Sequence, residues 1–255
     1  MLLLRSLVFN LAFYVNITLW MIAALPTLLM PRSALVAVVR AWAKSNLMLL
    51  RLIVGIRCEV RGRERIPQGG IIVASKHQSV WETFALYLIL DDPCYVLKRE
   101  LTWLPLFGWL AMKARMVPVD RGARSAAMKS MSEAAAVELA DGRQVVIFPE
   151  GTRRPPGAEP AYKFGVAYLY SEMNVPCLPV ALNSGLFWPR RTFMRYPGTL
   201  VVEFLDPLPA GLPKDQFLSR VETGIEQATG RLVEAGRQEQ ERLIGSSPSY
   251  KASED

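Results

Sequence analysis

The chemistry that this sequence can perform starts from its only histidine, His77, which is followed five positions later by the acidic residue Glu82. On a regular helix this spacing separates two side chains by about 140°, so they would not meet. They can meet if His77 lies in a loop and Glu82 lies in the first turns of the next helix, for which Ser79 is a suitable N-cap. The carboxylate would then keep one ring nitrogen protonated and leave the other free to accept a proton from an alcohol. We therefore predict a general base at His77, oriented by Glu82, rather than an ordinary structural histidine.

Other charged residues follow short β-branched runs, just as His77 follows residues 71–74. The comparable runs are residues 95–97, 116–119 and 145–148. The charged and turn-forming residues after them are Lys98, Arg121, Glu150, Gly151, Thr152 and Arg153. Open α/β sheets bind ligands at the carboxyl ends of their strands, so these residues would converge with the histidine. A histidine, several cations and two carboxylates suit attack by a hydroxyl group of a phosphate-bearing molecule.

The alternation of these runs with helical patterns determines the predicted fold. Further β-branched runs occupy residues 178–182 and 200–204, and helical patterns occupy residues 80–90, 125–139 and 213–233. Strands that alternate with helices favour an α/β fold with a mainly parallel sheet flanked by helices.

An apolar stretch precedes this α/β region. No charged residue lies between Arg5 and Arg32, and a membrane-spanning helix needs about 20 apolar residues. Asn10, Asn16 and Pro26 interrupt the stretch, so a tilted or re-entrant helix is an alternative to a spanning one. A cleaved signal peptide is a third alternative, although its apolar region is usually about 7–15 residues long and this stretch is longer. We expect an N-terminal membrane anchor.

The next segment, residues 33–56, has the pattern of an amphipathic helix. Its cations Arg40, Lys44 and Arg51 fall on one face at the helical repeat. The apolar residues on the opposite face are Leu35, Val38, Trp42, Leu49 and Ile53. Such a helix either lies in the membrane interface with its cations toward lipid headgroups, or packs with its apolar face on the domain. By the positive-inside rule, the cations place the rest of the chain in the cytoplasm.

The chain therefore divides into three predicted parts. Residues 1–57 form hydrophobic and amphipathic membrane-anchoring helices, and residues 58–240 form the α/β domain. Residues 241–255 form a polar tail that we expect to be disordered.

Composition limits the partners and cofactors. The formal net charge is +7, which suits nucleic acid, anionic lipid or a phosphorylated substrate. No RNA-binding signature or zinc-finger spacing is present, so we expect no nucleic acid partner. The three cysteines lie far apart, which argues against a disulfide framework or a zinc cluster, and a single histidine excludes a zinc site built on a histidine pair. We expect neither a metal nor a cofactor.

Several short blocks of the chain resemble those of the glycerophospholipid acyltransferases. Residues 77–82 resemble their HX4D block, and Phe148-Pro-Glu-Gly-Thr-Arg153 is similar to their FPEGTR block. Three further blocks with matching order and spacing are residues 98–101, 117–121 and 175–179. Within the family the chain is most similar to bacterial 1-acylglycerol-3-phosphate acyltransferases. One departure is Glu82, which stands where the family usually has Asp; the extra methylene lengthens the reach and keeps the charge.

The resemblance implies a membrane-bound enzyme of phospholipid biosynthesis. A fatty acyl group would move from acyl-CoA or acyl carrier protein to the sn-2 hydroxyl of lysophosphatidic acid and give phosphatidic acid. The implied substrate-binding residues are Lys98, Arg121 and Arg153, which would grip the acceptor's phosphate, and Glu150, Gly151 and Thr152. The implied location is a bacterial inner membrane, with membrane lipids as partners and the catalytic domain facing the cytoplasm.

Three alternatives to this function remain at the level of the sequence. The same motifs would serve another lyso-lipid acceptor, such as lyso-ornithine lipid. A lipid hydrolase with a serine nucleophile could also use a lone histidine, but no G-x-S-x-G occurs in the chain. A lipid-binding protein without enzymatic activity would keep the fold and would not need the imidazole of His77.

Overall fold

A seven-stranded sheet forms the centre of the described structure, a computed structural model in which residues 1–120, 122 and 124–245 are described. The strand order is β1-β7-β6-β2-β5-β3-β4, and all neighbouring pairs are parallel except β6 and β7. The strands are β1 (Ile56–Arg61), β2 (Ile71–Ser75), β3 (Pro93–Lys98), β4 (Val117–Val119), β5 (Gln144–Ile147), β6 (Cys177–Leu182) and β7 (Gly198–Phe204). Because β2 to β6 run in one direction, their carboxyl ends share one edge of the sheet.

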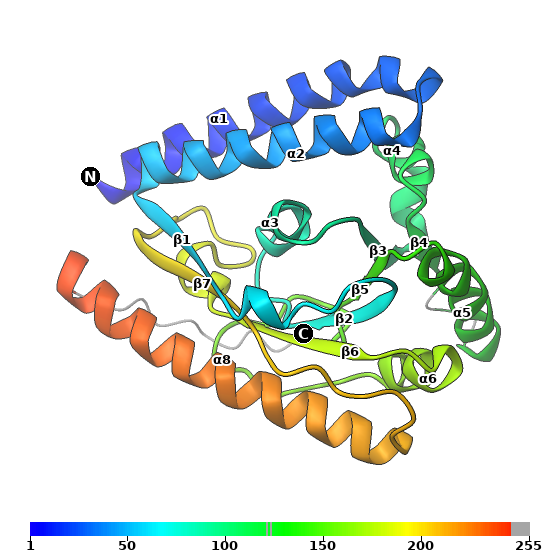
Figure 1. The fold of residues 1–255 in the computed structure, drawn as a ribbon. Coiled ribbons are helices and arrows are strands. Elements are labelled where there is room, and N and C mark those ends of the chain that lie inside the picture. The colour runs from blue at the N-terminus through cyan, green and yellow to red at the C-terminus, as the bar shows by residue number, and fades with distance from the viewer. Residues whose placement is uncertain (121, 123, 246–255) are drawn as a thin grey trace.

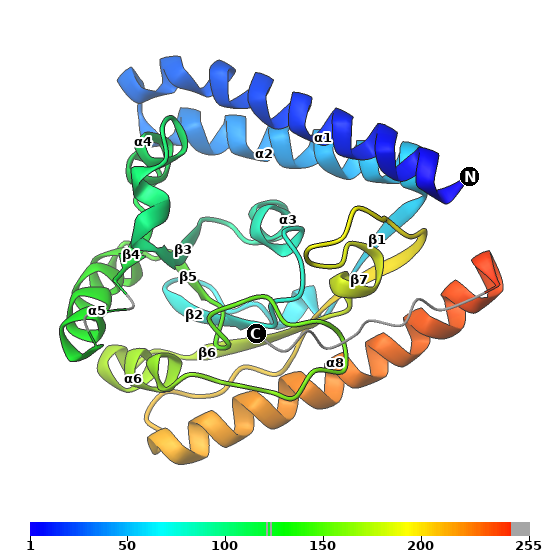
Figure 2. The same cartoon turned by 180° about the vertical axis from the view of Figure 1, so that it is seen from behind.

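Helices cover both faces of the sheet. One face carries α3, and a hairpin of α1 and α2 lies over it (Figure 1). The opposite face carries the long helix α8, with α6 and α5 beside it, as the reverse view also shows (Figure 2). The helices are α1 (Leu2–Ala24), α2 (Arg32–Leu49), α3 (Glu82–Ile89), α4 (Phe107–Lys113), α5 (Arg124–Ala140), α6 (Phe164–Met173), α7 (Ser184–Phe187) and α8 (Lys214–Ile244).

The central strands are buried on both faces, which is typical of a parallel sheet covered by helices. All five residues of β2 are buried, and alternate residues enter different cores because side chains alternate along a strand. Ile71 and Val73 pack in the core that includes α3, whereas Ile72 and Ala74 pack in the core that includes α5, α6 and α8. The predicted α/β fold with a mainly parallel, helix-flanked sheet is confirmed.

A missed strand and a longer final helix are two of the differences from the predicted elements. Strand β1 was not predicted, although its apolar residues Ile56, Cys58 and Val60 alternate with charged ones; it lies at the edge of the sheet, and only Ile56 among its residues is buried. The final helix α8 was predicted for residues 213–233 but continues to Ile244, so the first residues of the expected tail are helical. The expected disorder of residues 246–255 lies outside the described residues.

The N-terminal hairpin packs against the domain along its length. The ring of Trp42 in α2 lies 5.3 Å from the ring of Phe84 in α3. Arg40 donates hydrogen bonds to the carbonyl oxygens of Tyr87 at 3.1 Å and Leu90 at 3.2 Å, at the end of α3. Of the two alternatives for residues 33–56, the structure therefore supports packing of the apolar face on the domain. The alternative in which Arg40 faces lipid headgroups is wrong, because its guanidinium binds carbonyl groups that α3 leaves unpaired.

The outer side of the hairpin remains apolar and exposed. Two helical stretches, Leu2–Leu29 and Arg32–Val54, are long and apolar enough to cross a membrane. Only 22% of the most apolar window in each stretch is buried, whereas the core helix of a soluble protein would be mostly buried. The two N-terminal helices are thus compatible with a membrane anchor.

Candidate active site

The site begins where β2 ends. His77 lies in the loop after β2, and Glu82 is the first residue of α3, so the chain reverses between them. The Nδ1 atom of His77 lies 2.8 Å from Oε1 of Glu82, which is hydrogen-bonding distance. The loop-then-helix arrangement expected from the spacing is therefore present. The expected cap at Ser79 is wrong, since α3 starts at Glu82 and the Ser79 hydroxyl is 3.4 Å from the backbone N–H of Trp81.

The carboxylate of Glu82 is fully buried and accepts hydrogen bonds on both oxygens. Its Oε1 atom accepts the backbone N–H groups of Gln78 and Ser79, each at 2.7 Å. Its Oε2 atom accepts the hydroxyl of Ser184 at 2.8 Å. Because Oε1 already accepts two N–H donors, it carries no proton, and the Nδ1 atom of His77 must be the donor in their contact. In the neutral imidazole, the proton then sits on Nδ1, and Nε2 is the nitrogen that can act as a base.

The imidazole plane of His77 is fixed from a second direction. The Phe148 ring, which follows β5, stacks on it with centroids 4.0 Å apart and planes 17° apart. The carbonyl oxygen of His77 also accepts the backbone N–H of Arg154 at 2.8 Å, which joins the two loops. The loops after β2 and β5 thus hold the ring in one orientation, as a base that acts on a positioned substrate requires.

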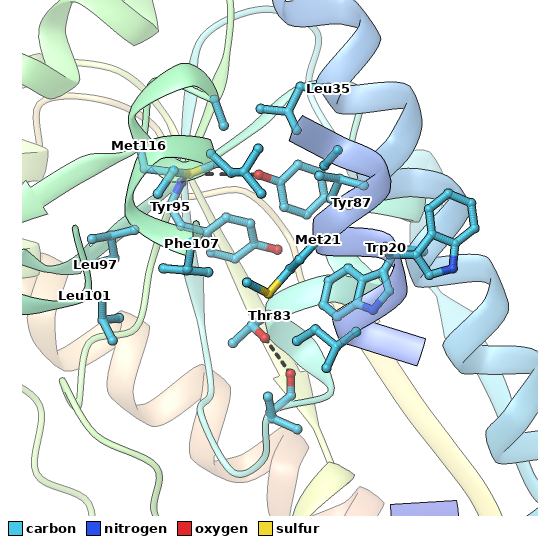
Figure 3. A pocket seen from close by; sticks show the side chains of 18 of the residues that line it. Trp20, Met21, Leu35, Thr83, Tyr87, Tyr95, Leu97, Leu101, Phe107 and Met116 are labelled. Atoms are coloured by element: carbon cyan, nitrogen blue, oxygen red, sulfur yellow. Dashed lines mark hydrogen bonds between the residues drawn. The ribbon is translucent and has the colours of Figure 1, made fainter. Parts of the chain in front are cut away.

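An apolar cavity of about 460 Å³ adjoins the histidine, and its size is typical of ligand pockets. His77, Phe148 and Arg153 line it near the sheet edge, and its other walls come from α1, α2, α3, β3 and α4. Figure 3 shows side chains from these elements directed into the same space, among them Trp20, Tyr87, Tyr95, Leu101 and Phe107. The cavity therefore leads from the His77–Glu82 pair to the N-terminal hairpin and suits a hydrocarbon chain.

Two of the three predicted phosphate-gripping cations line this cavity. Arg153 is half-buried, and burial lowers the pKa of its guanidinium; the charge of Glu82 opposes this shift, and the charges of Arg190 and Arg191 add to it. Like charges gathered in a partly dry place favour binding of an anion. Lys98 also lines the cavity and pairs with Glu100 at 3.1 Å. The third cation, Arg121, lies outside the described residues.

The predicted turn at residues 150–152 is present, but the carboxylate of Glu150 does not line the cavity. Gly151 has a φ of +66° and its N–H binds the carbonyl oxygen of Phe148, which makes a tight turn that favours glycine. Thr152 is half-buried in the same turn. The carboxylate of Glu150 is 1% exposed and binds Nζ of Lys76 at 2.8 Å.

The partners of Glu150 extend to the far side of the sheet. Lys76 also binds Glu226 of α8 at 2.6 Å, and Tyr162 donates a hydrogen bond to the same Glu226 carboxylate. Burial raises the pKa of Glu150, and the charge of Lys76 opposes this shift. The prediction that Glu150 contacts substrate needs correction, because in this structure its side chain anchors the turn. Substrate contacts by Gly151 and Thr152 stay predictions.

Three residues of this arrangement were not predicted from the sequence. Ser184, the first residue of α7, binds Glu82, Phe148 stacks on His77, and Gln78 accepts the backbone N–H of Gly185 at 3.1 Å. Phe148 belongs to a block that the sequence identifies, but its stacking on the histidine depends on the pairing of β2 with β5. For Ser184 the sequence carries no signal, since its partner lies 102 positions away.

Comparison with known proteins agrees with this geometry. The family model described as Acyltransferase matches residues 57–183. A 1-acyl-sn-glycerol-3-phosphate acyltransferase alpha of Homo sapiens is 32% identical over 191 residues, which cover 71% of this chain and 68% of the human protein. The chain belongs to this acyltransferase family. The expected resemblance to glycerophospholipid acyltransferases is thereby confirmed.

Two bacterial proteins add detail. The 1-acyl-sn-glycerol-3-phosphate acyltransferase of Pseudomonas aeruginosa is 40% identical over 165 residues, which cover 65% of this chain and 64% of that protein. The crystal structure of the 1-acyl-sn-glycerophosphate (LPA) acyltransferase PlsC from Thermotoga maritima matches with a TM-score of 0.76 and covers 91% of this chain and 98% of its own. At 21% identity, this second likeness demonstrates the shared fold alone.

Proposed function

We propose that the chain transfers a fatty acyl group from an acyl thioester to the sn-2 hydroxyl of lysophosphatidic acid and so forms phosphatidic acid. The observation that carries this proposal is the contact of His77 with Glu82 at the end of an apolar cavity that Arg153 also lines. The names of the Pseudomonas and human relatives support lysophosphatidic acid as the acceptor.

The proposed reaction uses the free Nε2 atom of His77 as a general base. The acceptor hydroxyl gives its proton to Nε2 while its oxygen attacks the thioester carbonyl, and Glu82 stabilises the imidazolium that forms. The tetrahedral intermediate then collapses. An ester bond replaces the thioester bond, and the departing thiolate takes the proton from the imidazolium.

Each part of the two substrates has a matching feature in the site. The acyl chain of the thioester occupies the apolar cavity, and the acceptor's phosphate lies near Arg153 and Lys98. Arg153 can bind a phosphate through two parallel hydrogen bonds, whereas Lys98 acts as a point charge. The role of Arg121 in this grip stays part of the proposal, as do those of Gly151 and Thr152.

The N-terminal hairpin supports a location of this chemistry at a membrane. Exposed apolar residues on α1 would enter the lipid, where both the acceptor and the product reside. We place the protein at a bacterial inner membrane, with the α/β domain on the cytoplasmic side. The donor is acyl-CoA or acyl carrier protein, and both are anionic partners that suit a chain of net charge +7.

The direct test offers the purified full chain a labelled acyl-CoA or acyl carrier protein together with lysophosphatidic acid. Labelled phosphatidic acid is the expected product, and the His77→Ala variant should form almost none of it. The same assay with lyso-ornithine lipid as an alternative acceptor determines which lipid the chain prefers. Preference for that lipid, which lacks a phosphate, would overturn the role given to Arg153.

A further inference from the structure

The segment Arg99–Lys113, named here the portal segment, presents two different apolar faces. It consists of a short helical turn (Arg99–Trp103), residues 104–106 and α4 (Phe107–Lys113). Its inner residues Leu101, Phe107, Leu110 and Ala111 line the apolar cavity. Leu101 and Phe107 are also each 38% exposed, so they form a rim at which the cavity meets the surface.

The outer face of the portal segment exposes large apolar side chains to solvent. The exposed fractions are 65% for Trp103, 49% for Leu104, 57% for Trp109 and 55% for Met112. A patch of this kind on a soluble surface marks an interaction site, because water-exposed indole and aliphatic groups in one place are unfavourable. Two tryptophans beside leucine and methionine are typical of the boundary between lipid headgroups and acyl chains.

The patch continues onto the N-terminal hairpin. Nζ of Lys113 at the end of α4 donates a hydrogen bond to the carbonyl oxygen of Leu28 at 3.1 Å, in the bend between α1 and α2. The next residues of the bend, Leu29 and Met30, are exposed. Both views place α4 against this bend (Figures 1 and 2). A bilayer that contacts the bend of the hairpin would therefore also contact the portal segment.

Cations frame the apolar patch in the way that an anionic bilayer requires. The guanidinium of Arg99 lies 5.5 Å from the ring of Trp103, and its charge is shared with Asp120 at 2.8 Å. Lys98 and Lys113 flank the segment at its two ends. Amphipathic cations beside exposed indoles favour a lipid surface over a protein partner.

Two tight backbone features fix the conformation of the portal segment between its cavity-lining face and its exposed face. Leu106 has φ 63° and ψ −58°, and the N–H of Phe107 binds the carbonyl oxygen of Pro105 at 2.7 Å, which defines a strained γ-turn. A Cβ atom at Gly108 would lie 2.0 Å from the carbonyl oxygen of Thr102, so only glycine fits there. Backbone strain of this kind concentrates at functional segments.

We propose that the portal segment docks on the bilayer through Trp103, Leu104, Trp109 and Met112, and that the lipid acceptor moves from the bilayer past Leu101 and Phe107 to His77. The docking step stands on the exposed patch alone, while the acceptor's path rests on the proposed function. The two parts need separate measurements, one without turnover and one with it.

Docking is measured by tryptophan fluorescence of the full chain on vesicles that contain anionic phospholipid and a brominated lipid, which quenches nearby indoles. Substitution of Trp103 and Trp109 by phenylalanine conserves the apolar surface and removes two candidate reporters. Of the four tryptophans that remain, Trp81 and Trp188 are buried, while Trp20 and Trp42 of the hairpin are half-buried and contribute equally to both proteins. The quenched fraction of the emission should therefore fall in the double variant. If the brominated lipid removes the same absolute amount of emission from the variant as from the unmodified chain, neither indole meets lipid. That result would overturn the docking step, whether or not the chain makes phosphatidic acid.

The acceptor's path is measured by kinetics with octanoyl-CoA as donor and two acceptors, long-chain lysophosphatidic acid in vesicles and soluble hexanoyl lysophosphatidic acid. The Trp103→Ser/Trp109→Ser variant should lose about tenfold in kcat/KM for the vesicle acceptor, which corresponds to about 1.4 kcal/mol. Its kcat/KM for the soluble acceptor should stay within about twofold, because neither residue lines the cavity.

The matched control is Val137→Ser/Leu243→Ser, which changes exposed apolar residues on α5 and α8 away from the hairpin. It should leave both acceptors unaffected. An equal loss on both acceptors in the tryptophan variant would indicate a general structural defect and would overturn the path. An unaffected vesicle rate would overturn it as well. If the unmodified chain acylates neither acceptor, the proposed function fails, and the quenching result still decides the docking step.

Discussion

At the scale of single residues, the site depends on how completely Glu82 is hydrogen-bonded. Its two oxygens accept one ring N–H, two backbone N–H groups and one hydroxyl. This arrangement fixes which nitrogen of the neutral His77 ring carries the proton, and therefore which one would accept a proton in the proposed reaction. It also explains how glutamate can stand where the family usually has aspartate, since the loop and Ser184 surround the longer side chain.

The first prediction concerns the charge of this carboxylate. Glu82→Gln should lower kcat by at least about 10²-fold, because an amide cannot hold the imidazole in one tautomer and stabilise its cation. Glu82→Asp keeps the charge and should retain more activity than the amide variant. Steady-state kinetics with lysophosphatidic acid measures both. Equal activity of the two variants would contradict the role of the charge.

Ser184 provides a second prediction at this scale. Ser184→Ala leaves Oε2 of the buried Glu82 carboxylate without its donor, which should lower the free energy of unfolding by about 1–3 kcal/mol. Because Ser184 acts through Glu82, kcat should fall while the KM values stay close to those of the unmodified chain. Ser171→Ala, which removes a hydroxyl bonded to a carbonyl within α6, is the control in urea unfolding and should be nearly neutral.

The third prediction separates Arg153 from its neighbour Arg154. Arg153→Ala should raise the KM for lysophosphatidic acid by about tenfold or more, since a charge-assisted hydrogen bond contributes about 1.5–3 kcal/mol. The KM for the acyl donor should change less. Arg154 instead donates to the carbonyl oxygen of Glu159, so Arg154→Ala should affect neither constant strongly. Equal rises for acceptor and donor would contradict the phosphate grip.

At the scale of elements, the sequence predicts the site edge well because of one topological rule. β2, β5, β3 and β4 are adjacent and parallel, so the residues that follow them gather at one edge. Short β-branched apolar runs reveal these strands, of which β2 and β5 are buried on both faces. The edge strand β1 has no continuous apolar run, since Ile56, Cys58 and Val60 alternate with charged residues and five of its six residues are exposed.

Contacts between distant elements are what the sequence could not provide. Glu150 looks like a substrate residue in its motif, but Lys76, which also binds Glu226 of α8, holds it inside the domain. Only the packing of α8 across the sheet brings Glu226 to Lys76, from which it is separated by 150 positions in the sequence. The same applies to Ser184, which reaches Glu82 from the end of β6. Motifs thus predict which loops form the site, and tertiary packing decides which of their side chains face it.

The buried ion pair gives a fourth prediction. Lys76→Met leaves the carboxylate of Glu150 buried without its cation, which should lower the free energy of unfolding by about 3–5 kcal/mol. Glu150→Gln should cost less, because Lys76 keeps Glu226 as a partner. The double variant should recover part of the loss caused by Lys76→Met. Urea unfolding of all three variants provides the measurement, and additive losses would contradict the coupling of the pair.

At the scale of the whole molecule, the hairpin of α1 and α2 is a wall of the active-site cavity as well as a candidate anchor. Arg32 of α2 binds Asp92, and Arg195 binds Ser6 and Asn10 of α1, so both helices are tied to the domain. The apolar face that the sequence assigns either to lipid or to the domain therefore packs on the domain. In our proposal, the opposite side of the hairpin and the portal segment are therefore the surfaces that contact the membrane.

This shared wall predicts that the hairpin limits the length of the transferred acyl chain. Ala24 of the hairpin, Leu35 and Ala114 line the cavity and are buried together, so the cavity is closed at that end. Ala24→Leu should fill this end and exclude terminal methylenes, each of which contributes about 0.8 kcal/mol. The ratio of kcat/KM for long over short acyl-CoA should then fall about tenfold for two excluded methylenes. Ala136→Leu on the exposed side of α5 is the matched control. A folded Ala24→Leu variant with an unchanged ratio would show that the acyl chain does not reach the hairpin.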